Sequence, residues 1–291
     1  MKVLVTGACG QLGTALRQIA PAGWLFSDIA GDGILHLDIT DAAAVKAVVE
    51  SNGIEAVVNC AAYTNVEAAE DNPSDAMLLN GTAPGILAAA MKERGGLVLH
   101  ISTDYVFGGE TFTKPIKEDA APAPISVYGQ SKLMGEEAVK ASGADYIIIR
   151  TAWMYSQWGK NFVKTIRALT STRNSIKVVQ DQQGTPTYAP DLAAAILVIL
   201  DKYAGGAPCC GVYNYTGEGS TNWYLFACEI ARLSGITSCI IAPCSSAEFP
   251  TKAARPKYSV LDKTLVKETF GIEIPSWEDS LRRCISAILQ S

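Results

Sequence analysis

The sequence of 291 residues has few charges and no long apolar segment. Charged residues make up 18%, and 24 Lys and Arg against 29 Asp and Glu give a net charge of −5. The absence of a basic block argues against a nucleic-acid binder. No uninterrupted apolar run approaches the ~18–20 residues that a membrane span needs, and the apolar stretch in residues 1–7 is too short for a signal peptide. These absences predict a cytoplasmic protein without nucleic-acid or membrane partners.

Metal-binding patterns are also missing. The eight cysteines are scattered apart from the adjacent pair Cys209 and Cys210, and none forms the C-x-x-C spacing of a zinc site. The two histidines, His36 and His100, are too few for a histidine-rich centre. We therefore expect no bound metal.

What is present is ample apolar sequence, because hydrophobic residues make up 48%. In residues 1–150, short runs rich in β-branched residues alternate with helical stretches. Continuous apolar strands that alternate with helices are typical of a parallel sheet covered on both faces. The sequence therefore predicts a doubly wound, Rossmann-like α/β fold. The expected strands are 3–5, 25–26, 34–37, 56–60, 97–101 and 146–149, and the expected helices are 12–20, 41–51, 73–93 and 127–142.

The pattern changes after Thr151, where Gly and Pro interrupt the chain more often. Three further helices are expected, at 190–203, 222–233 and 277–289. We predict a dinucleotide-binding domain over 1–150, to which part of 176–215 could also contribute. Residues 151–291 would mainly form a smaller α+β cap that binds substrate and is interleaved with the first domain.

A glycine-rich turn follows the first predicted strand directly and opens a helix. Gly7, Gly10 and Gly13 enclose Gln11 and Leu12 in this turn. Glycines there allow a tight turn and let the backbone approach a pyrophosphate, which would bind at the helix N-terminus. The spacing is G-x-x-G-x-x-G rather than G-x-G-x-x-G, and a turn without a ligand is the alternative.

Two acidic residues could contact the other end of a dinucleotide. Asp28 ends the second predicted strand, at the spacing where an acidic residue bonds the adenosine ribose. A carboxylate there repels a 2′-phosphate and favours NADH over NADPH, although a turn or capping role is the alternative. Asp38, with Ile39 beside it, follows the third strand and could reach the adenine.

Tyr128 and Lys132 are spaced i, i+4, so on a helix they share one face. An adjacent ammonium stabilises a phenolate and would lower the pKa of the tyrosine, which could then act as a general acid. The spacing alone is a weak signal. Its context is the strand 97–101, which leads into Ser102 and Thr103, where a hydroxyl could hold a substrate oxygen.

These motifs together resemble the extended short-chain dehydrogenase/reductase family. The resemblance rests on the glycine turn and on segments 59–64, 102–107 and 128–132. Segments 150–155, 160–162, 181–187 and 255–256 are similar to a branch that reduces keto sugars linked to dTDP. The similarity extends over nearly the whole chain, and segment 181–187 is the most specific part of it.

The resemblance implies hydride transfer from NADPH or NADH to C4 of a dTDP-linked 4-keto-6-deoxyhexose. Thr103 and Tyr128 would bond the keto oxygen, and Tyr128 would donate the proton. Lys132 would bind the nicotinamide ribose and depress the pKa of Tyr128. By the same resemblance, further contacts are expected from Ala61, Ala62 and Tyr63 to the cofactor, from Val66, Asp104, Tyr105 and Trp153 to the sugar nucleotide, and from Arg255 to its pyrophosphate. A core role for Trp153 and a capping role for Asp104 are the alternatives.

One family feature is not matched. Some members dimerise around magnesium held by acidic residues on the first helix and near the start of the helix 190–203. Here the corresponding residues are Ala15 and Pro190, and only Asp191 is acidic. Because a hard cation needs several oxygen ligands, we expect a monomer or a weak homodimer without metal.

Two other functions stay open on the sequence alone. A nucleotide-sugar epimerase or dehydratase of the same superfamily would share these motifs. A non-catalytic NADP-binding regulatory subunit would share the fold over its whole length. The complete set of Thr103, Tyr128 and Lys132 favours a catalytic protein.

Overall fold

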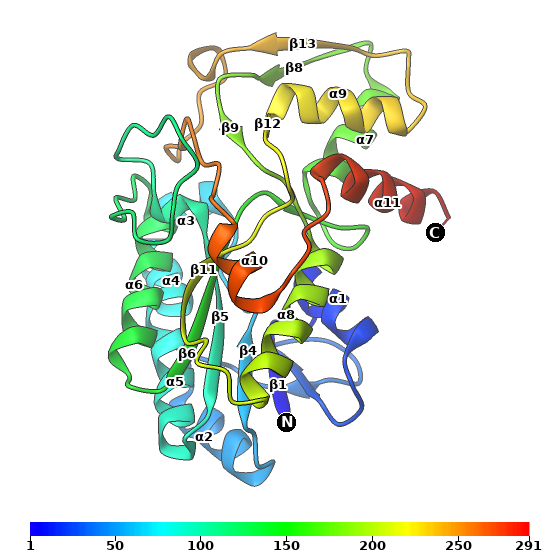
Figure 1. Cartoon of the computed structure of the whole chain (residues 1–291). Helices are drawn as coiled ribbons and strands as arrows, with labels where there is room; N and C mark the ends of the chain where they lie inside the picture. Colours follow the sequence, from blue (N-terminus) through cyan, green and yellow to red (C-terminus); the bar gives the residue numbers. More distant parts are fainter. Residues whose placement is uncertain (291) are drawn as a thin grey trace.

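A seven-stranded parallel sheet forms the centre of the molecule, in the order β11-β6-β5-β4-β1-β2-β3 (Figure 1). The structure is a computed structural model and describes residues 1–290. Every pair of neighbouring strands is parallel, so their carboxyl ends meet at one edge. The strands are β1 (Val3–Thr6), β2 (Leu25–Asp28), β3 (Leu35–His36), β4 (Ala56–Asn59), β5 (Leu97–Thr103), β6 (Asp145–Thr151) and β11 (Gly211–Asn214).

Helices cover both faces of this sheet, as predicted for a doubly wound fold (Figure 1). Alternate residues of each strand point to opposite faces: Val3 and Val5 join one core, whereas Leu4 joins the other. The first core includes α1 (Gln11–Ile19), α8 (Ala189–Ala204) and α10 (Thr264–Phe270), and the second includes α2 (Ala42–Ser51), α5 (Ala83–Arg94) and α6 (Val127–Ala141). The strands are therefore buried on both sides, which explains their continuous apolar sequences.

A smaller lobe, which we call the cap, lies above the carboxyl edge of the sheet (Figure 1). It has its own aromatic-rich core, in which Tyr155 and Tyr188 stack and Phe226 packs against Trp277. Its elements are β7 (Met154–Tyr155), α7 (Phe162–Thr172), β8 (Ser175–Val179), β9 (Gln183–Gly184), β10 (Thr187–Tyr188), β12 (Thr221–Asn222), α9 (Trp223–Leu233), β13 (Ile240–Cys244), the short 3₁₀ helix η3 (Ser246–Glu248) and α11 (Trp277–Gln290).

The two lobes are interleaved in the sequence. After β7–β10 the chain returns to the sheet as α8 and then as β11, which pairs with β6 over Ile147–Arg150. Residues beyond 151 therefore supply one edge of the central sheet.

The prediction of one regular helix over 73–93 is wrong. It comprises α4 (Pro73–Ala76), a π-helix η1 (Met77–Thr82) and α5. Pro84 cannot donate a hydrogen bond and its ring would clash with the carbonyl of residue 80 in a regular helix, so the wider π turn accommodates it. Gly135 of α6 packs on that carbonyl, since a Cβ there would lie 2.1 Å from the Asn80 oxygen.

Two further short helices are α3 (Val66–Asp71) and the 3₁₀ turn η2 (Asp104–Val106), which directly follows β5. Within residues 1–290, none of the helices combines the length and apolar character needed to cross a bilayer.

Candidate active site

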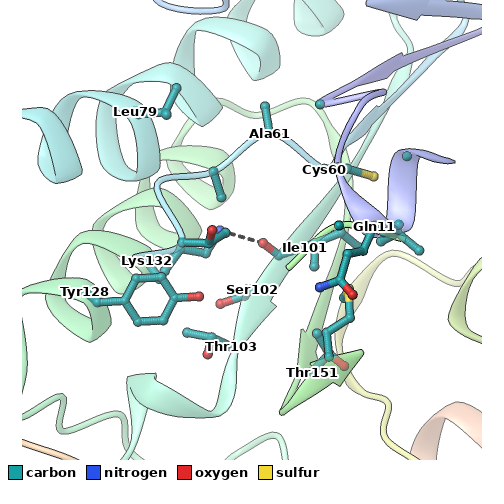
Figure 2. Close-up of a pocket in the computed structure, with 18 of the residues that line it drawn as sticks. Gln11, Cys60, Ala61, Leu79, Ile101, Ser102, Thr103, Tyr128, Lys132 and Thr151 are labelled. Atoms are coloured by element: carbon teal, nitrogen blue, oxygen red, sulfur yellow. Dashed lines mark hydrogen bonds between the residues drawn. The ribbon is translucent and has the colours of Figure 1, made fainter. Parts of the chain in front are cut away.

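A cavity of about 670 Å³ opens at the carboxyl edge of the sheet, between the sheet and the cap. In open parallel sheets this edge is where ligands bind. All the predicted cofactor and substrate residues line it except Tyr63, whose backbone is instead tied to the side chain of Asn80 by two hydrogen bonds. Figure 2 shows that side chains from α1, β5, β6 and α6 face this space.

The glycine turn lies at one end of the cavity and is shaped by close backbone contacts. Gly7 has φ +68°, and a Cβ on it would lie 2.5 Å from the Ala61 nitrogen. A Cβ on Gly13 would lie 2.3 Å from the Gly7 oxygen. Gly10 is the N-cap of α1, and no side chain caps this helix. The backbone amides at the start of α1 are therefore free to bind a pyrophosphate. The residues of this turn thus fit a dinucleotide.

The two predicted acidic residues lie beside this turn. Asp28 accepts hydrogen bonds from the backbone nitrogens of Cys9 (2.9 Å) and Ile29 (2.8 Å), which hold its carboxylate at the cavity wall. Asp38 accepts from the hydroxyl and the backbone nitrogen of Thr40, and these bonds lower its pKa. Both carboxylates can therefore accept hydroxyl donors from a ribose or amine donors from a base.

Tyr128 lies in the first turn of α6, which Ser126 caps by accepting a hydrogen bond from the Gly129 nitrogen. A Cβ on Gly129 would be 2.2 Å from the Tyr105 oxygen, so this glycine lets α6 approach η2 closely. The Tyr105 and Tyr128 rings pack edge to face at 5.4 Å. Thr103, the last residue of β5, lies close enough to the Tyr128 hydroxyl to lower its pKa. The start of α6 and the end of β5 thus place the two side chains in the same part of the cavity (Figure 2).

The expectation that Lys132 depresses the pKa of Tyr128 is wrong for this structure. Burial raises the pKa of Tyr128 to about 12, and the nearby Thr103 hydroxyl offsets only part of this. Lys132 is 2% exposed, and its amino group donates to the Ile101 carbonyl oxygen at 2.6 Å (Figure 2). Burial lowers the pKa of Lys132 to about 8. Desolvation outweighs the charge effect that the i, i+4 spacing suggests.

Asp104 is buried directly beside Thr103 and keeps one oxygen unused. Its Oδ1 accepts from the Thr103 hydroxyl at 3.1 Å, whereas its Oδ2 has no hydrogen-bond partner among residues 1–290. Burial raises the pKa of Asp104 to about 6. A buried carboxyl oxygen without a partner at the cavity is a suitable acceptor for a sugar hydroxyl.

The cap side of the cavity is an aromatic wall. Trp153 stacks on Trp223, with ring centroids 3.6 Å apart and planes 13° apart. Within residues 1–290, Trp153 is the one non-glycine residue with positive φ, at 48°. A Cβ on Gly184 would lie 2.6 Å from the Trp153 ring, so Gly184 leaves room for it. Trp153 thus lines the cavity as well as packing on the cap core.

Arg255 approaches the cavity from the loop before α10. Its Nη2 donates to Glu67 of α3 at 2.8 Å, while its Nε is buried with no partner in the described part of the chain. Val66 lines the cavity one residue before Glu67. A guanidinium with an unused donor suits a phosphate oxygen.

Several cavity residues were missed by the sequence reasoning. Trp223 comes from α9, Thr151 ends β6, and Met154, Lys160 and Asn161 come from the segment after it. Segments 150–155 and 160–162 carried the resemblance, so four of these five had a signal, whereas Trp223 had none.

Among residues 1–290, no group of three His, Cys, Asp or Glu side chains is arranged to hold a metal ion.

The cofactor turn and the cap are also connected directly. The Gln11 Oε1 accepts from the Ser156 hydroxyl at 2.8 Å and from the Asn161 amide at 2.9 Å. Asn161 in turn caps α7 by accepting from the Lys164 nitrogen. We call this contact the Gln11 clasp, and it joins the first residue of α1 to the start of α7.

A parallel sheet of this strand order, with a glycine turn and a Tyr–Lys pair at its carboxyl edge, defines the class of short-chain dehydrogenases and reductases. Residues 1–290 match the family model of the RmlD substrate binding domain. A dTDP-4-dehydrorhamnose reductase from Burkholderia thailandensis is 39% identical over 99% of both chains. The chain therefore belongs to this family of reductases, which confirms the predicted family and fold class.

Two solved structures agree with this assignment. A dTDP-4-dehydrorhamnose reductase from Clostridium acetobutylicum has a TM-score of 0.92 and 41% identity over the whole of both chains. A second such enzyme, from Bacillus anthracis in complex with NADP, has a TM-score of 0.90 and 36% identity over 99% of this chain and all of its own. The likeness thus extends to the cap as well as to the sheet.

Proposed function

We propose that the chain is a cytoplasmic reductase that uses NADPH or NADH to convert dTDP-4-dehydrorhamnose to dTDP-L-rhamnose. The observation that carries the proposal is the meeting of Tyr128, Thr103 and Lys132 at the strand ends, in the same cavity as an uncapped glycine turn. The names of the relatives support the substrate, and the NADP complex of one relative supports the cofactor.

The dinucleotide would lie along the sheet edge from the glycine turn to Lys132. Gly10 and the α1 amides would hold its pyrophosphate, with Ala61, which packs against Gly7, and Ala62 lining the groove beside the turn. Asp28 and Asp38 would accept hydrogen bonds from its adenosine part, and Lys132 would donate to the nicotinamide ribose. When bound, the reduced cofactor supplies the hydride that the carbonyl carbon accepts.

Tyr128 would supply the proton that balances this hydride. Because its pKa is raised to about 12, the phenol is fully protonated near pH 7 and ready to donate. The O–H bond of Tyr128 breaks as the former keto oxygen becomes a hydroxyl, which leaves a phenolate. When substrate is bound, the Thr103 hydroxyl would turn from Asp104 Oδ1 to donate its one hydrogen to the same oxygen and orient it.

The rest of the substrate would be held by groups that the structure leaves with unused polar atoms. Asp104 Oδ2 would accept from a sugar hydroxyl, and Arg255 Nε would donate to the pyrophosphate. Trp153, Val66 and Tyr105 would contact the apolar faces of the sugar nucleotide. Burying these polar atoms without such partners costs about 1–3 kcal/mol each, so substrate binding would recover that free energy.

The choice between NADH and NADPH depends on Asp28. Its carboxylate faces the region expected to hold the adenosine ribose, and a 2′-phosphate there would meet a like charge. We propose that both cofactors are accepted, with NADH preferred. Asp28→Asn, which removes the charge, should shift the preference towards NADPH.

The test is an assay of NADH and NADPH oxidation with dTDP-4-dehydrorhamnose, followed by identification of the sugar product. Formation of dTDP-L-rhamnose with stoichiometric cofactor oxidation is the expected result. Sugar isomerisation or loss of water without net cofactor oxidation would instead indicate an epimerase or dehydratase. Cofactor binding without any turnover would indicate the regulatory subunit.

A further inference from the structure

A row of buried polar side chains lies behind Lys132, outside the catalytic set. It consists of Thr6 on β1, Asn59 on β4 and His100 on β5, which neighbour one another across the sheet. His100 is 0% exposed and Asn59 1%. Buried polar groups at 0–1% exposure are costly unless each is satisfied, so the direction of every hydrogen bond in the row is constrained.

The orientation of the Asn59 amide is fixed by a backbone group. Asn59 Oδ1 accepts from the Thr6 hydroxyl at 2.7 Å and from the Ala61 nitrogen at 3.2 Å. A backbone N–H can only donate, so the atom facing Ala61 must be the oxygen. The Asn59 nitrogen therefore faces His100 Nδ1, at 3.1 Å.

This orientation determines the tautomer of His100. Because Asn59 Nδ2 donates, His100 Nδ1 must be the acceptor and carry no hydrogen. The single hydrogen of the neutral ring then lies on Nε2, which is 3.5 Å from the Lys132 nitrogen. Burial, with a contribution from the charge of Lys132, lowers the pKa of His100 well below its usual value, so the ring stays neutral.

We propose that His100 is a positioning residue for Lys132, because its ring, locked by Asn59, presents an N–H to the lysine nitrogen and favours the neutral amine. The Lys132 nitrogen would then lie between a donor, His100 Nε2, and an acceptor, the Ile101 carbonyl. As the amine, Nζ accepts from Nε2–H and donates to Ile101, whereas the ammonium has no lone pair and keeps only the donation to Ile101. The consequence for catalysis rests on the proposed function, in which Lys132 binds the cofactor.

The other titratable groups around Lys132 act against this effect. Glu136, one turn further along α6, attracts the ammonium and raises the pKa of Lys132, and so does Cys60 after β4. Tyr128 is neutral, because its pKa is raised to about 12. Burial and the His100 N–H thus favour the amine, while the Glu136 carboxylate favours the ammonium.

The tautomer can be read directly without substrate or cofactor. In protein labelled with ¹⁵N-histidine there are only two rings, because the chain has two histidines. His36 is exposed, so its ring provides a solvent-accessible reference spectrum. We expect His100 to carry its hydrogen on Nε2 and to stay neutral through the physiological pH range. A hydrogen on Nδ1, or protonation of His100 within that range, would overturn the proposal.

Asn59→Asp tests the link to Lys132. An aspartate of the same shape still accepts from Thr6 and Ala61, but it also accepts from His100, so the hydrogen moves to Nδ1. His100 Nε2 then accepts from the ammonium. The pKa of Lys132 is about 8, so loss of the ammonium should weaken NADH binding on the alkaline side. In Asn59→Asp the accepting Nε2 and the added carboxylate charge both raise this pKa, so the alkaline limbs of NADH affinity and of kcat/KM should move up by about 1 pH unit.

Thr6→Val is the matched control, because it removes a hydrogen bond from the same row but leaves Asn59 oriented by Ala61. Neither the tautomer nor the alkaline limb should move. If the ring hydrogen moved to Nδ1 in Asn59→Asp but the pH dependence of NADH affinity stayed as in the wild type, His100 would be purely structural. If the protein proved not to be a reductase, the NMR and binding measurements would still decide this proposal. The wild-type spectrum also needs no variant to fold.

Discussion

Tyr128 shows how strongly a site depends on burial at the scale of single residues. A phenol whose pKa is about 12 holds its proton over the whole physiological range, so the donor is fully protonated but is a weak acid. The same burial makes the phenolate left after donation costly. Its stabilisation therefore falls to Thr103, which lowers the pKa of Tyr128, and to the charges that the bound cofactor and substrate bring near it.

Tyr128→Phe should separate proton donation from binding. The variant keeps the ring and its packing on Tyr105 but removes the hydroxyl. We expect kcat to fall about 10²–10⁴-fold, with NADH affinity unchanged in a calorimetric titration. Tyr203→Phe is the matched control, since it also removes a phenol hydrogen bond, from Tyr203 of α8 to Asp145 at the start of β6, yet should leave kcat unchanged because neither residue lines the cavity. A kcat for Tyr128→Phe within about threefold of wild type would rule out Tyr128 as the acid.

Asp104 should give the activity a pH dependence near 6. Its charge raises the pKa of Tyr128, so an ionised Asp104 makes the phenol a weaker acid. The pKa of Asp104 is about 6, and below this pH the carboxyl becomes neutral. We therefore expect kcat/KM to rise as pH falls through about 6. Asp104→Asn should abolish this step in the profile, whatever its effect on the absolute rate, and a step that persists would assign it to another group.

The residues that the sequence predicted well are those whose positions follow from local spacing. Tyr128 and Lys132 share a helix face, and Thr103 ends the strand beside it, so local geometry brings them together. Trp223 could not be predicted, because only the folding of the cap brings α9 against Trp153. The direction of the Tyr128 pKa shift was missed for a similar reason, since desolvation depends on everything packed around the ring.

Among the elements, the glycine turn with α1 is the one most sensitive to a small change. Gly10 has φ −72° and ψ 174°, a conformation open to any residue. An added Cβ would lie 3.2 Å from the Gly7 oxygen, so only a small shift is needed. The turn can therefore accept a side chain structurally, although the side chain would occupy the approach to the helix N-terminus.

Gly10→Val should accordingly fold but lose cofactor affinity. The branched side chain excludes the pyrophosphate from the α1 amides, and we expect NADH affinity to drop by at least about 100-fold. Gly205→Val at the end of α8, where φ is −75°, is the control for a glycine replaced far from the cavity. Calorimetry on both folded variants provides the measurement. Unchanged affinity in Gly10→Val would remove the turn from the site.

Predictions of elements succeeded where one periodicity persisted and failed where packing changed it. The helices expected at 190–203 and 277–289 correspond to α8 and α11 within a residue or two. The π turn η1 interrupts the expected helix 73–93, because Pro84 and the close approach of Gly135 act together there. α7 was missed because its start depends on Asn161, whose amide is also held by Gln11 from far away in the sequence.

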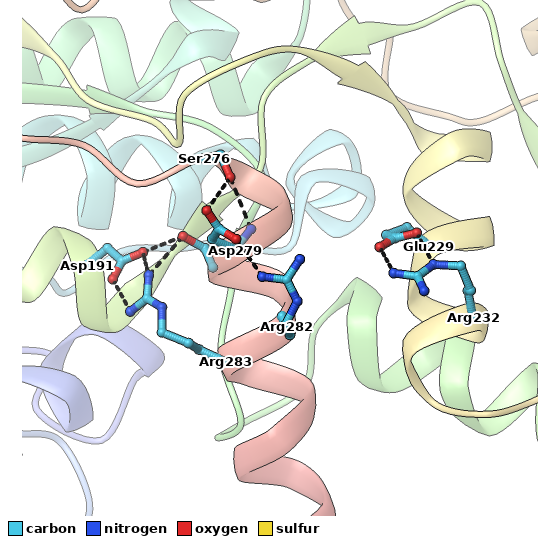
Figure 3. A network of polar contacts seen from close by, with 8 residues as sticks. Asp191, Glu229, Arg232, Ser276, Asp279, Arg282 and Arg283 are labelled. Carbon is cyan, nitrogen blue, oxygen red and sulfur yellow. Dashed lines mark hydrogen bonds and ion pairs between the residues drawn. The ribbon is translucent and has the colours of Figure 1, made fainter.

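On the scale of the whole molecule, the surface where α8 meets α11 bears on assembly. Figure 3 shows Asp191 at the start of α8 in a bidentate ion pair with Arg283 of α11, at 2.7 and 2.6 Å. The Ser280 hydroxyl donates to the same carboxylate at 2.5 Å. Ala15, the other residue expected near such a metal, is buried and offers no oxygen ligand. The one carboxylate is thus engaged within its own chain.

We therefore predict that magnesium has no role in assembly or activity. EDTA should leave kcat unchanged, and light scattering should give the same mass with and without magnesium, near the 30.8 kDa of one chain. Asp191→Asn is the control variant. It weakens the ion pair with Arg283 and should lower the free energy of unfolding without changing the response to EDTA. A dimer that dissociates only when magnesium is removed would contradict this prediction.

The arrangement of the lobes was only partly visible in the sequence. Alternating strands and helices in residues 1–150 predicted the doubly wound sheet, because each strand carries its own apolar signal. The strand β11 is only four residues long and follows a glycine-rich stretch, so nothing local assigns it to the sheet. Its place is fixed by pairing with β6, which no short window of sequence records.

The return of the chain to the sheet also limits how the protein can be divided. A fragment ending at residue 150 would lack both β11 and α8, so β6 would become a bare edge with unpaired backbone groups, and the core beneath α8 would face water. Such a fragment would aggregate rather than bind nucleotide. The cap is not one continuous segment either, because α8 and β11 separate its elements β7–β10 from β12 and the elements that follow. Gene fusions and split versions of this enzyme must therefore keep residues 1–214 together, and swapping the cap with a relative would require exchanging several separate segments.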